Sequence, residues 1–175
     1  MIRGTNPLTG RPYATSRPQY AGNGENGMPD KNTIEMLIDQ ALSMMDRSYI
    51  PYSNFAVGAA LLCEDGSVYT GCNIENAAFT PTICAERTAF FKAVSEGKTS
   101  FKAIAIAGGA DRIPDAMTSP CGVCRQVMME FCDPADFYVI MAAGRKSCRV
   151  LSLQELLPLG FGPGNMKIRP LGHES

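Results

Sequence analysis

Apolar residues recur at helical spacing between residues 32 and 49. The stripe consists of Ile34, Leu37, Ile38, Ala41, Leu42 and Met45. These separations follow a repeat of 3.6 residues, so the side chains share one face of an α-helix. Asn32 precedes the stripe with Glu35 three residues later, a pair typical of a helix capping box. Because Pro51 cannot continue a helix, the pattern predicts one from Asn32 to about Tyr49.

A continuous apolar run follows from Phe55 to Cys63, without the alternate polar positions of a half-exposed strand. Such a run is typical of a strand that is buried on both faces. Asp65-Gly66 then marks a tight hairpin, because these residue types tolerate the backbone angles of such turns. The returning strand runs from Val68 to about Cys72. The sequence therefore predicts a β-hairpin whose first strand is buried.

The rest of the chain alternates between helical and extended patterns. The predicted elements are a helix over Ile83–Glu96, a strand over Phe101–Ala107, a loop with Gly108 and Gly109, a helix from Gly122 to about Phe131, strands over Phe137–Met141 and Cys148–Leu151, and a helix over Leu153–Leu157. The link Ala143–Lys146 is too short for a parallel crossover, which needs about a dozen residues. The last two strands are therefore expected to pair antiparallel.

These elements together predict the fold class. Helices that alternate with apolar strands pack their apolar faces on both sides of one sheet. We therefore expect an α/β protein, a three-layer α/β/α sandwich with a mixed five-stranded sheet in which strands four and five are antiparallel. Two helix N-termini, near Cys84 and Cys121, are expected to lie together at the ends of the strands.

Residues 1–30 differ from the rest of the chain. Met1–Pro29 contains five glycines and four prolines and has no apolar periodicity. A segment of this composition cannot bury enough apolar surface to offset its loss of conformational entropy on folding. A targeting helix is not indicated, because helix breakers interrupt the stretch. We expect a disordered N-terminal extension over residues 1–30 and a single folded domain over residues 31–175.

Composition narrows the class of protein. The 175 residues carry a formal charge of −1 and are 45% hydrophobic, which suits one soluble domain with a sizeable core. No run of about 18 apolar residues indicates a membrane span, and the charge balance does not indicate a nucleic-acid surface. Seven cysteines without a secretory signal peptide are typical of reduced thiols in the cytoplasm. We expect a cytoplasmic protein with a small-molecule substrate.

Two cysteine stretches carry the candidate chemistry, Cys84-Ala85-Glu86-Arg87 and Pro120-Cys121-Gly122-Val123-Cys124. A C-x-x-C pair at a helix start places both sulfurs where backbone N–H groups and the helix dipole favour thiolates. Cys84, at the start of another predicted helix, can supply a third ligand. Three protein ligands leave the fourth position of a tetrahedral zinc ion to water, as in catalytic sites. Glu86 then lies beside that open position.

Two alternatives explain part of this pattern. A C-G-x-C sequence at a helix start also resembles a thioredoxin-type redox pair, but that interpretation leaves Cys84 and Glu86 unexplained. A structural zinc with four cysteines needs a fourth ligand, and none of the remaining cysteines forms another close pair. These candidates are Cys63, Cys72, Cys132 and Cys148. We favour the catalytic site, in which the one histidine, His173 near the C-terminus, takes no part.

Four motifs in one order carry a resemblance to a known family. They are Pro51-Tyr52-Ser53-Asn54-Phe55, Cys72-Asn73-Ile74-Glu75-Asn76-Ala77, Cys84-Ala85-Glu86-Arg87-Thr88-Ala89 and Pro120-Cys121-Gly122-Val123-Cys124-Arg125-Gln126. Together they resemble the short, homotetrameric cytidine deaminases, and the similarity runs from the first helix to Gly162-Pro163. Any one motif alone would be weak. Zinc deaminases in general have a histidine where this chain has Cys84, which resembles the free-nucleoside branch.

The resemblance implies the reaction and its cofactor. One Zn²⁺ per chain would be held by Cys84, Cys121 and Cys124, and cytidine and deoxycytidine would be deaminated hydrolytically to uridine and deoxyuridine, with release of ammonia, in pyrimidine salvage. In this family zinc activates a water molecule, and the residue that stands at Glu86 moves protons to the ring and to the leaving amine. One carboxylate thus acts as base and as acid in turn.

The resemblance also implies the contacts with the nucleoside. Asn73 and Glu75 are expected to bind ribose hydroxyls. Phe55 is expected to lie against the pyrimidine ring, and Ala85 to contact the substrate. Arg87 is expected to donate to a ligand sulfur, because three thiolates and Zn²⁺ carry a net charge of −1 that a guanidinium can offset.

Phe161 lies in Leu156-Leu157-Pro158-Leu159-Gly160-Phe161-Gly162-Pro163, which resembles the C-terminal segment of the family. The phenylalanine of that segment reaches the active site of a neighbouring subunit. The resemblance therefore implies a homotetramer with active sites shared between subunits. The loop Ala78-Phe79-Thr80-Pro81 and the longer N-terminal tail depart from the family pattern, and these departures concern loop contacts and the tail rather than the chemistry.

Two other functions stay open. A deaminase of a cytosine-containing antibiotic such as blasticidin S would share the zinc motifs, although Asn73 and Glu75 favour a nucleoside. A non-catalytic zinc-binding or thiol-redox module would need neither Glu86 nor a nucleoside pocket. Release of ammonia from cytidine separates these functions.

Overall fold

The computed structural model describes residues 27–114 and 117–166. Its elements are α1 (Lys31–Met45), β1 (Phe55–Cys63), β2 (Val68–Cys72), α2 (Ala85–Ser95), β3 (Phe101–Ala110), α3 (Gly122–Phe131), β4 (Tyr138–Ala142), β5 (Cys148–Ser152), α4 (Leu153–Leu156) and a 3₁₀ turn over Pro163–Met166. Residues 1–26 of the predicted extension and His173 lie outside the described residues. Within the described ranges, no helix has the length and apolar composition needed to cross a membrane.

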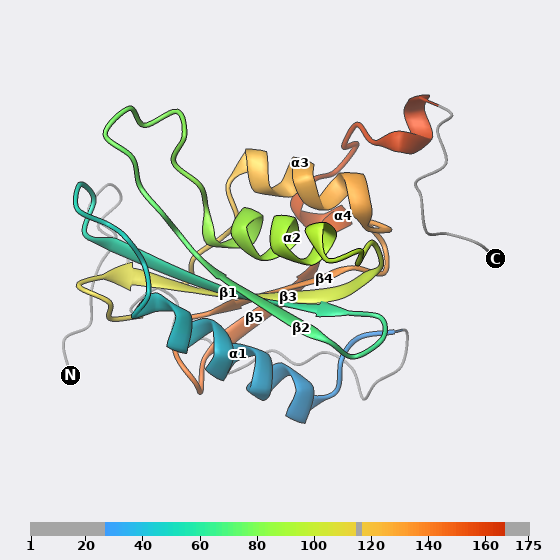
Figure 1. The fold of residues 1–175 in the computed structure, drawn as a ribbon. Coiled ribbons are helices and arrows are strands. Elements are labelled where there is room, and N and C mark those ends of the chain that lie inside the picture. The colour runs from blue at the N-terminus through green and yellow to red at the C-terminus, as the bar shows by residue number, and fades with distance from the viewer. Residues whose placement is uncertain (1–26, 115–116, 167–175) are drawn as a thin grey trace.

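The five strands form one mixed sheet in the order β2-β1-β3-β4-β5. β1 pairs antiparallel with both β2 and β3, β3 pairs parallel with β4, and β4 pairs antiparallel with β5. α1 covers one face of the sheet, and α2, α3 and α4 cover the other (Figure 1). The structure therefore confirms the predicted three-layer sandwich, including the antiparallel pairing of the last two strands.

The central strand β1 is buried on both faces because successive side chains enter different cores. Ala59 and Leu61 pack in the core beneath α2 and α3, whereas Ala60 and Leu62 pack in the core beneath α1. In the first core, the ring of Phe90 lies 4.9 Å from that of Phe101, measured between centroids. This arrangement explains why the strand has no polar positions to alternate with its apolar ones.

Two glycines allow helices to approach the sheet closely from opposite sides. A Cβ atom at Gly58 would lie 2.9 Å from the amide nitrogen of Met45 in α1 and would overlap with the carbonyl oxygen of Ala41. A Cβ atom at Gly71 would lie 2.6 Å from the amide nitrogen of Ala89 in α2. Side chains at these positions would therefore push the helices away from β1 and β2.

The predicted N-cap and the predicted end of the first helix are wrong. α1 begins at Lys31, and its N-cap is Asp30, whose side chain accepts a hydrogen bond from the amide of Thr33 at 2.9 Å. The carboxylate of Asp30 satisfies a free amide of the first turn, so Asn32 lies inside the helix and is not its cap. The helix ends at Met45. Tyr49 is already in an extended pairing with Ile74 beside the sheet, so the helix cannot reach it.

The predicted glycine loop after the third strand is also wrong. β3 extends to Ala110, and Gly108 and Gly109 pair within it with Val57 and Ala56 of β1. A Cβ atom at Gly109 would overlap with the carbonyl oxygen of Ile113, so this glycine marks close approach of a following loop rather than a turn. The other helix and strand ends lie within two residues of their predicted positions.

Candidate active site

Cys84, Cys121 and Cys124 lie at the N-terminal ends of two helices on the same face of the sheet. Cys84 is the N-cap of α2 and Cys121 is the N-cap of α3, and neither side chain makes a capping hydrogen bond. Cys124 lies in the first turn of α3 and is buried. The positive ends of two helix dipoles therefore act on the three sulfurs and favour their thiolate forms.

The spacing of these sulfurs fits a zinc ion. Sγ of Cys121 lies 3.9 Å from Sγ of Cys84 and 3.5 Å from Sγ of Cys124, and all three atoms lie within 4.8 Å of one another. A tetrahedral ion with Zn–S bonds of about 2.3 Å requires sulfurs about 3.8 Å apart. Within the described ranges, no other group of three or more His, Cys, Asp or Glu residues is close enough to hold a metal.

The backbone before Cys84 is fixed by the end of β2. The amides of Ile74 and Ile83 each donate to the carbonyl of the other residue, both at 3.0 Å. Thr88, one turn into α2, donates its hydroxyl to the carbonyl oxygens of Cys72 at 3.1 Å and Cys84 at 3.2 Å. These bonds set where α2 begins, and they therefore set the position of the Cys84 sulfur.

Arg87 lies against the sulfur of Cys84. Its Nη2 is 3.5 Å from that sulfur and 3.3 Å from the carbonyl oxygen of Thr82, which orients the guanidinium. Hydrogen bonding with Cys124 and with Arg87 lowers the pKa of Cys84 to about 5, whereas the bond with Cys84 and burial raise the pKa of Cys124, so one proton is shared unequally between these two sulfurs. The buried Nε of Arg87 has no hydrogen-bond partner among the described residues. The contact with sulfur is the expected one, and its effect on bound zinc stays a prediction.

Glu86 supplies a buried carboxyl group next to the cysteine cluster. It is 4% exposed and lies in the first turn of α2. Burial, and to a smaller extent the negative charge of Cys84, raise the pKa of Glu86 to about 7. A carboxyl group whose pKa is near neutrality can both accept and donate protons at physiological pH. The environment is therefore suited to the predicted acid–base role.

Asn73 and Glu75 follow β2, and both bind backbone groups of the segment around β1. The side chain of Asn73 accepts from the amide of Val57 and donates to the carbonyl of Phe55, each at 2.8 Å. Oε2 of Glu75 accepts from the amides of Tyr52 at 2.9 Å and Ser53 at 3.2 Å. Hydrogen bonds from Ser53 and Tyr52 hold the pKa of Glu75 below its ordinary value. Sequence reasoning missed this structural role.

The other residues expected to contact the nucleoside lie in different environments. Phe55, at the start of β1, is 39% exposed, and Phe161 is 59% exposed. Ala85, the first residue of α2, has no exposed surface in the isolated chain. The substrate contacts of all three residues stay predictions.

Arg125 and Gln126, directly after the second cysteine pair, have a role that sequence reasoning missed. Arg125 donates from Nε to the carbonyl oxygen of Pro120 at 2.9 Å and from Nη1 to that of Leu156 at 2.6 Å. Gln126 donates from Nε2 to the carbonyl oxygen of Phe161 at 2.8 Å. Helix α3 therefore holds both the turn with Cys121 and the C-terminal segment. The position of Arg125 and Gln126 directly after the C-x-x-C motif was the sequence signal that could have indicated these roles.

Comparison with known proteins agrees with this site. The profile of the cytidine and deoxycytidylate deaminase zinc-binding region matches residues 31–141. A cytidine deaminase from Halalkalibacterium halodurans is 47% identical over 133 residues, which cover 75% of this chain and 96% of that protein. A cytidine deaminase from Sporosarcina psychrophila is 55% identical over 100 residues, 57% of this chain and 71% of that protein.

Solved structures show the same fold. The crystal structure of a cytidine deaminase from Burkholderia pseudomallei superposes with a TM-score of 0.66 at 43% identity, over 72% of this chain and 97% of that chain. The enzyme from Mycobacterium tuberculosis superposes with a TM-score of 0.63 at 37% identity, over 73% and 95%. Residues 31–141, which the family profile matches, include the cysteine cluster and the strands β1, β2 and β3. The chain therefore belongs to the cytidine and deoxycytidylate deaminase family.

Proposed function

We propose that this protein is a zinc-dependent enzyme that deaminates cytidine and deoxycytidine to uridine and deoxyuridine, with release of ammonia, in pyrimidine salvage. The observation that carries the proposal is the convergence of three thiols at two helix N-termini beside a buried carboxyl group. Three sulfurs leave one zinc position open for chemistry, unlike a four-cysteine structural site. The named relatives, matched over most of their length, support the substrate.

Each residue of the site has a role in this proposal. Cys84, Cys121 and Cys124 would hold one Zn²⁺ per chain, and a bound Zn²⁺ lowers the pKa of a water molecule to about 7. Glu86 accepts one proton from the attacking water and passes it to N3 of the cytosine ring, then accepts the proton that remains on the hydroxyl at C4 and passes it to the amine, which leaves as ammonia. Arg87 offsets the negative charge of the three thiolates by donating to Cys84.

The nucleoside is recognised on the side of β1 and β2 that borders the cluster. Glu75 binds two backbone amides through Oε2, so its Oε1 can accept from a ribose hydroxyl. Asn73 has one amide hydrogen beyond the one it donates to Phe55. Phe55 offers a partly exposed ring to the base, and Ala85 adds a contact at the helix start.

We assign catalysis to one domain over residues 31–175 in a cytoplasmic protein. The family profile begins at residue 31, where α1 also begins. None of the seven cysteines, all of which lie in the described ranges, forms a disulfide, which is typical of a reducing compartment. A nucleic-acid or membrane partner has no part in this proposal.

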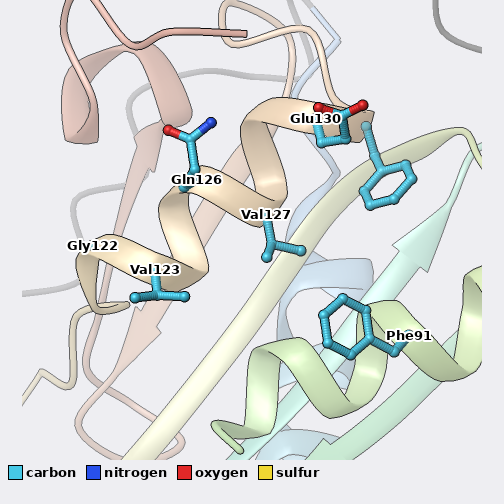
Figure 2. Close-up of a pocket in the computed structure, with 7 residues that line it drawn as sticks. Phe91, Gly122, Val123, Gln126, Val127 and Glu130 are labelled. Atoms are coloured by element: carbon cyan, nitrogen blue, oxygen red, sulfur yellow. The ribbon is translucent and has the colours of Figure 1, made fainter. Parts of the chain in front are cut away.

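The active enzyme is a homotetramer with shared active sites. Figure 2 shows an apolar groove between α2 and α3, where Phe91 faces Val127, with Val123 at its end. Its volume is about 550 Å³, and Phe91 and Val123 are 48% and 58% exposed. Exposed apolar surface of this kind marks a contact surface. Gln126 of the same helix α3 binds the carbonyl of Phe161, and in this proposal the ring of Phe161 enters a neighbouring site.

Ammonia release from purified protein tests the proposed function. Cytidine and deoxycytidine should each yield one ammonia per uridine or deoxyuridine, and chelation of zinc should abolish the release. Release from blasticidin S but not from cytidine would indicate an antibiotic deaminase instead. A protein that binds zinc but releases ammonia from none of these compounds would be a non-catalytic module.

A further inference from the structure

We propose that Arg112, in the loop after β3, is a positioning residue for nucleoside recognition: its guanidinium binds the segment that pairs with Asn73 and Glu75. The inference rests on the proposed function, because it takes the nucleoside roles of Asn73 and Glu75 from there. The guanidinium of Arg112 donates to backbone carbonyl groups of Met45 and Ser48.

The first step is the contact between Arg112 and the end of α1. Its Nη1 donates to the carbonyl oxygen of Met45 at 2.7 Å, and its Nη2 donates to that of Ser48 at 3.2 Å. The last carbonyl groups of a helix lack partners within the helix, and a cation near them is stabilising. Arg112 therefore fixes the turn Asp46–Ser48, which belongs to no helix or strand.

The second step connects this turn to the recognition residues. Tyr49, next to Ser48, donates from its amide to the carbonyl oxygen of Asn73 at 3.0 Å and accepts from the amide of Glu75 at 2.9 Å. One residue thus bonds to both ends of the Asn73–Glu75 segment. A shift of the Ser48–Tyr49 backbone would move both side chains expected to bind the sugar.

The third step concerns the loop that carries Arg112. Asn54, Asp111 and Arg112 all have positive φ angles, of 53°, 52° and 60°. Asn and Asp tolerate this region, but for arginine it is uncommon and strained, so the surrounding contacts must hold it there. The side-chain amide of Asn54 donates to Asp111, and the amide of Asp111 donates to the carbonyl of Asn54 at 3.1 Å. These bonds fix the backbone from which the side chain of Arg112 reaches the turn Asp46–Ser48.

The chemistry of these contacts predicts an effect on affinity rather than on turnover. The groups that Arg112 binds are backbone carbonyls, so its removal changes geometry without leaving a carboxylate unpaired. The start of α2 has a further anchor outside the Asn73–Glu75 segment, because Thr88 donates its hydroxyl to the carbonyl oxygens of Cys72 and Cys84. The zinc ligands and Glu86 should therefore keep their arrangement when Arg112 is replaced.

Steady-state kinetics of variants test the proposal. Arg112→Ala should raise KM for cytidine about tenfold, the effect expected for two lost hydrogen bonds, with kcat changed less than about twofold and zinc content unchanged. Arg112→Lys should restore part of the affinity, because an ammonium cannot bind both carbonyls with the geometry of a guanidinium. Methylguanidinium at non-denaturing concentration should lower the KM of Arg112→Ala. Arg47→Ala, which removes a guanidinium from the same turn, is the matched control.

Hydrogen exchange supplies a readout that does not depend on the substrate. The amides of Tyr49 and Glu75 should exchange faster in Arg112→Ala, or in Arg112→Lys if the alanine variant does not fold, and not in Arg47→Ala. Unchanged exchange and unchanged KM would overturn the proposal, as would a fall in kcat at constant KM. If the parent protein does not deaminate cytidine, the proposed function fails, whereas the exchange data still decide whether Arg112 holds this segment.

Discussion

The seven cysteines of this chain divide into two groups by position. Three converge at helix N-termini, whereas the other four are buried at separate places. Burial raises the pKa of the Cys63, Cys72 and Cys132 thiols. None of the four lies in a group of potential metal ligands among the described residues, so these side chains pack as small apolar groups.

Metal analysis of single cysteine variants tests this division. Serine at Cys84, Cys121 or Cys124 should reduce zinc below one ion per chain, because two thiolates cannot close the site. Alanine at Cys63, Cys132 or Cys148 should leave one zinc per chain and cost only stability. A variant of this second set that loses its zinc while still folded would contradict the assignment of ligands.

Glu86→Gln separates chemistry from binding. The amide has nearly the same shape as the carboxyl group but cannot move protons, so kcat for cytidine should fall by at least about 10²–10⁴-fold. Zinc content and the affinity for uridine, measured by calorimetry, should stay within a few-fold of the parent. A turnover close to that of the parent would refute the acid–base role.

The same variant should show a pH-dependent gain in the stability of the metal-free protein. The pKa of Glu86 is raised to about 7 from its usual 4.5, so the folded state holds the proton more tightly than the unfolded state. The contribution of Glu86 to the free energy of unfolding is therefore fully present below about pH 4.5 and is lost as the pH rises through 7. Chelator-treated Glu86→Gln should unfold at higher urea concentration than the parent at about pH 8, by up to about 3 kcal/mol in free energy. The difference should shrink toward pH 5.

At the scale of elements, the position of α2 depends on its close contact with β2. A side chain at Gly71 would press on the backbone of Ala85 and Ala89, and α2 carries Cys84 at its start. Gly71→Ala should therefore destabilise the fold by about 1–3 kcal/mol and weaken zinc retention against a chelator. Gly122→Ala is the matched control next to the other ligands, since a Cβ there meets no atom within 4 Å. Equal zinc retention in both variants would contradict this dependence.

The elements that sequence predicted well are those whose signal is local. The apolar run of β1, the Asp65-Gly66 turn and the helical stripe of α1 each follow from periodicity and turn chemistry, and the structure confirms them. The ends of elements were predicted less well. Gly108 and Gly109 have the composition of a loop, but their place in β3 depends on the loop that packs against them, which local sequence does not reveal.

The candidate site could be predicted only as far as its residue types reveal their chemistry. Three cysteines and a glutamate at helix starts indicate zinc and proton transfer by themselves. The bonds of Asn73 to β1 and of Arg112 to the end of α1 depend on which segments meet in space. A lone arginine in a loop gives no sequence signal of the carbonyls that it binds. Such supporting contacts were therefore missed.

At the scale of the whole molecule, Leu159 and Phe161 of the C-terminal segment have no place in the core of their own chain, whereas Leu156 and Leu157 pack against it. Leu159 and Phe161 are both exposed, and Leu159 has a positive φ angle of 57°. The backbone is nevertheless ordered, because Gln126 binds the carbonyl of Phe161 and Gly162 packs on Met129. An exposed aromatic ring on a fixed backbone is preorganised to bind another surface, since its backbone loses little entropy on binding.

Mixed oligomers distinguish a shared site from a self-contained one. If Phe161 completes the pocket of a neighbouring subunit, a Phe161→Ala chain supplies no ring to that neighbour. The same chain still carries an intact Glu86 in its own site. Coexpression with inactive Glu86→Gln chains should then restore activity above the summed activities of the two parents, because some pockets combine an intact Glu86 with a neighbour's intact Phe161. The test requires that Phe161→Ala alone be substantially impaired, and Leu159→Ala serves as a control for general disturbance of the segment. Mixed oligomers confirmed by mass that show no such gain would place the action of Phe161 within its own chain.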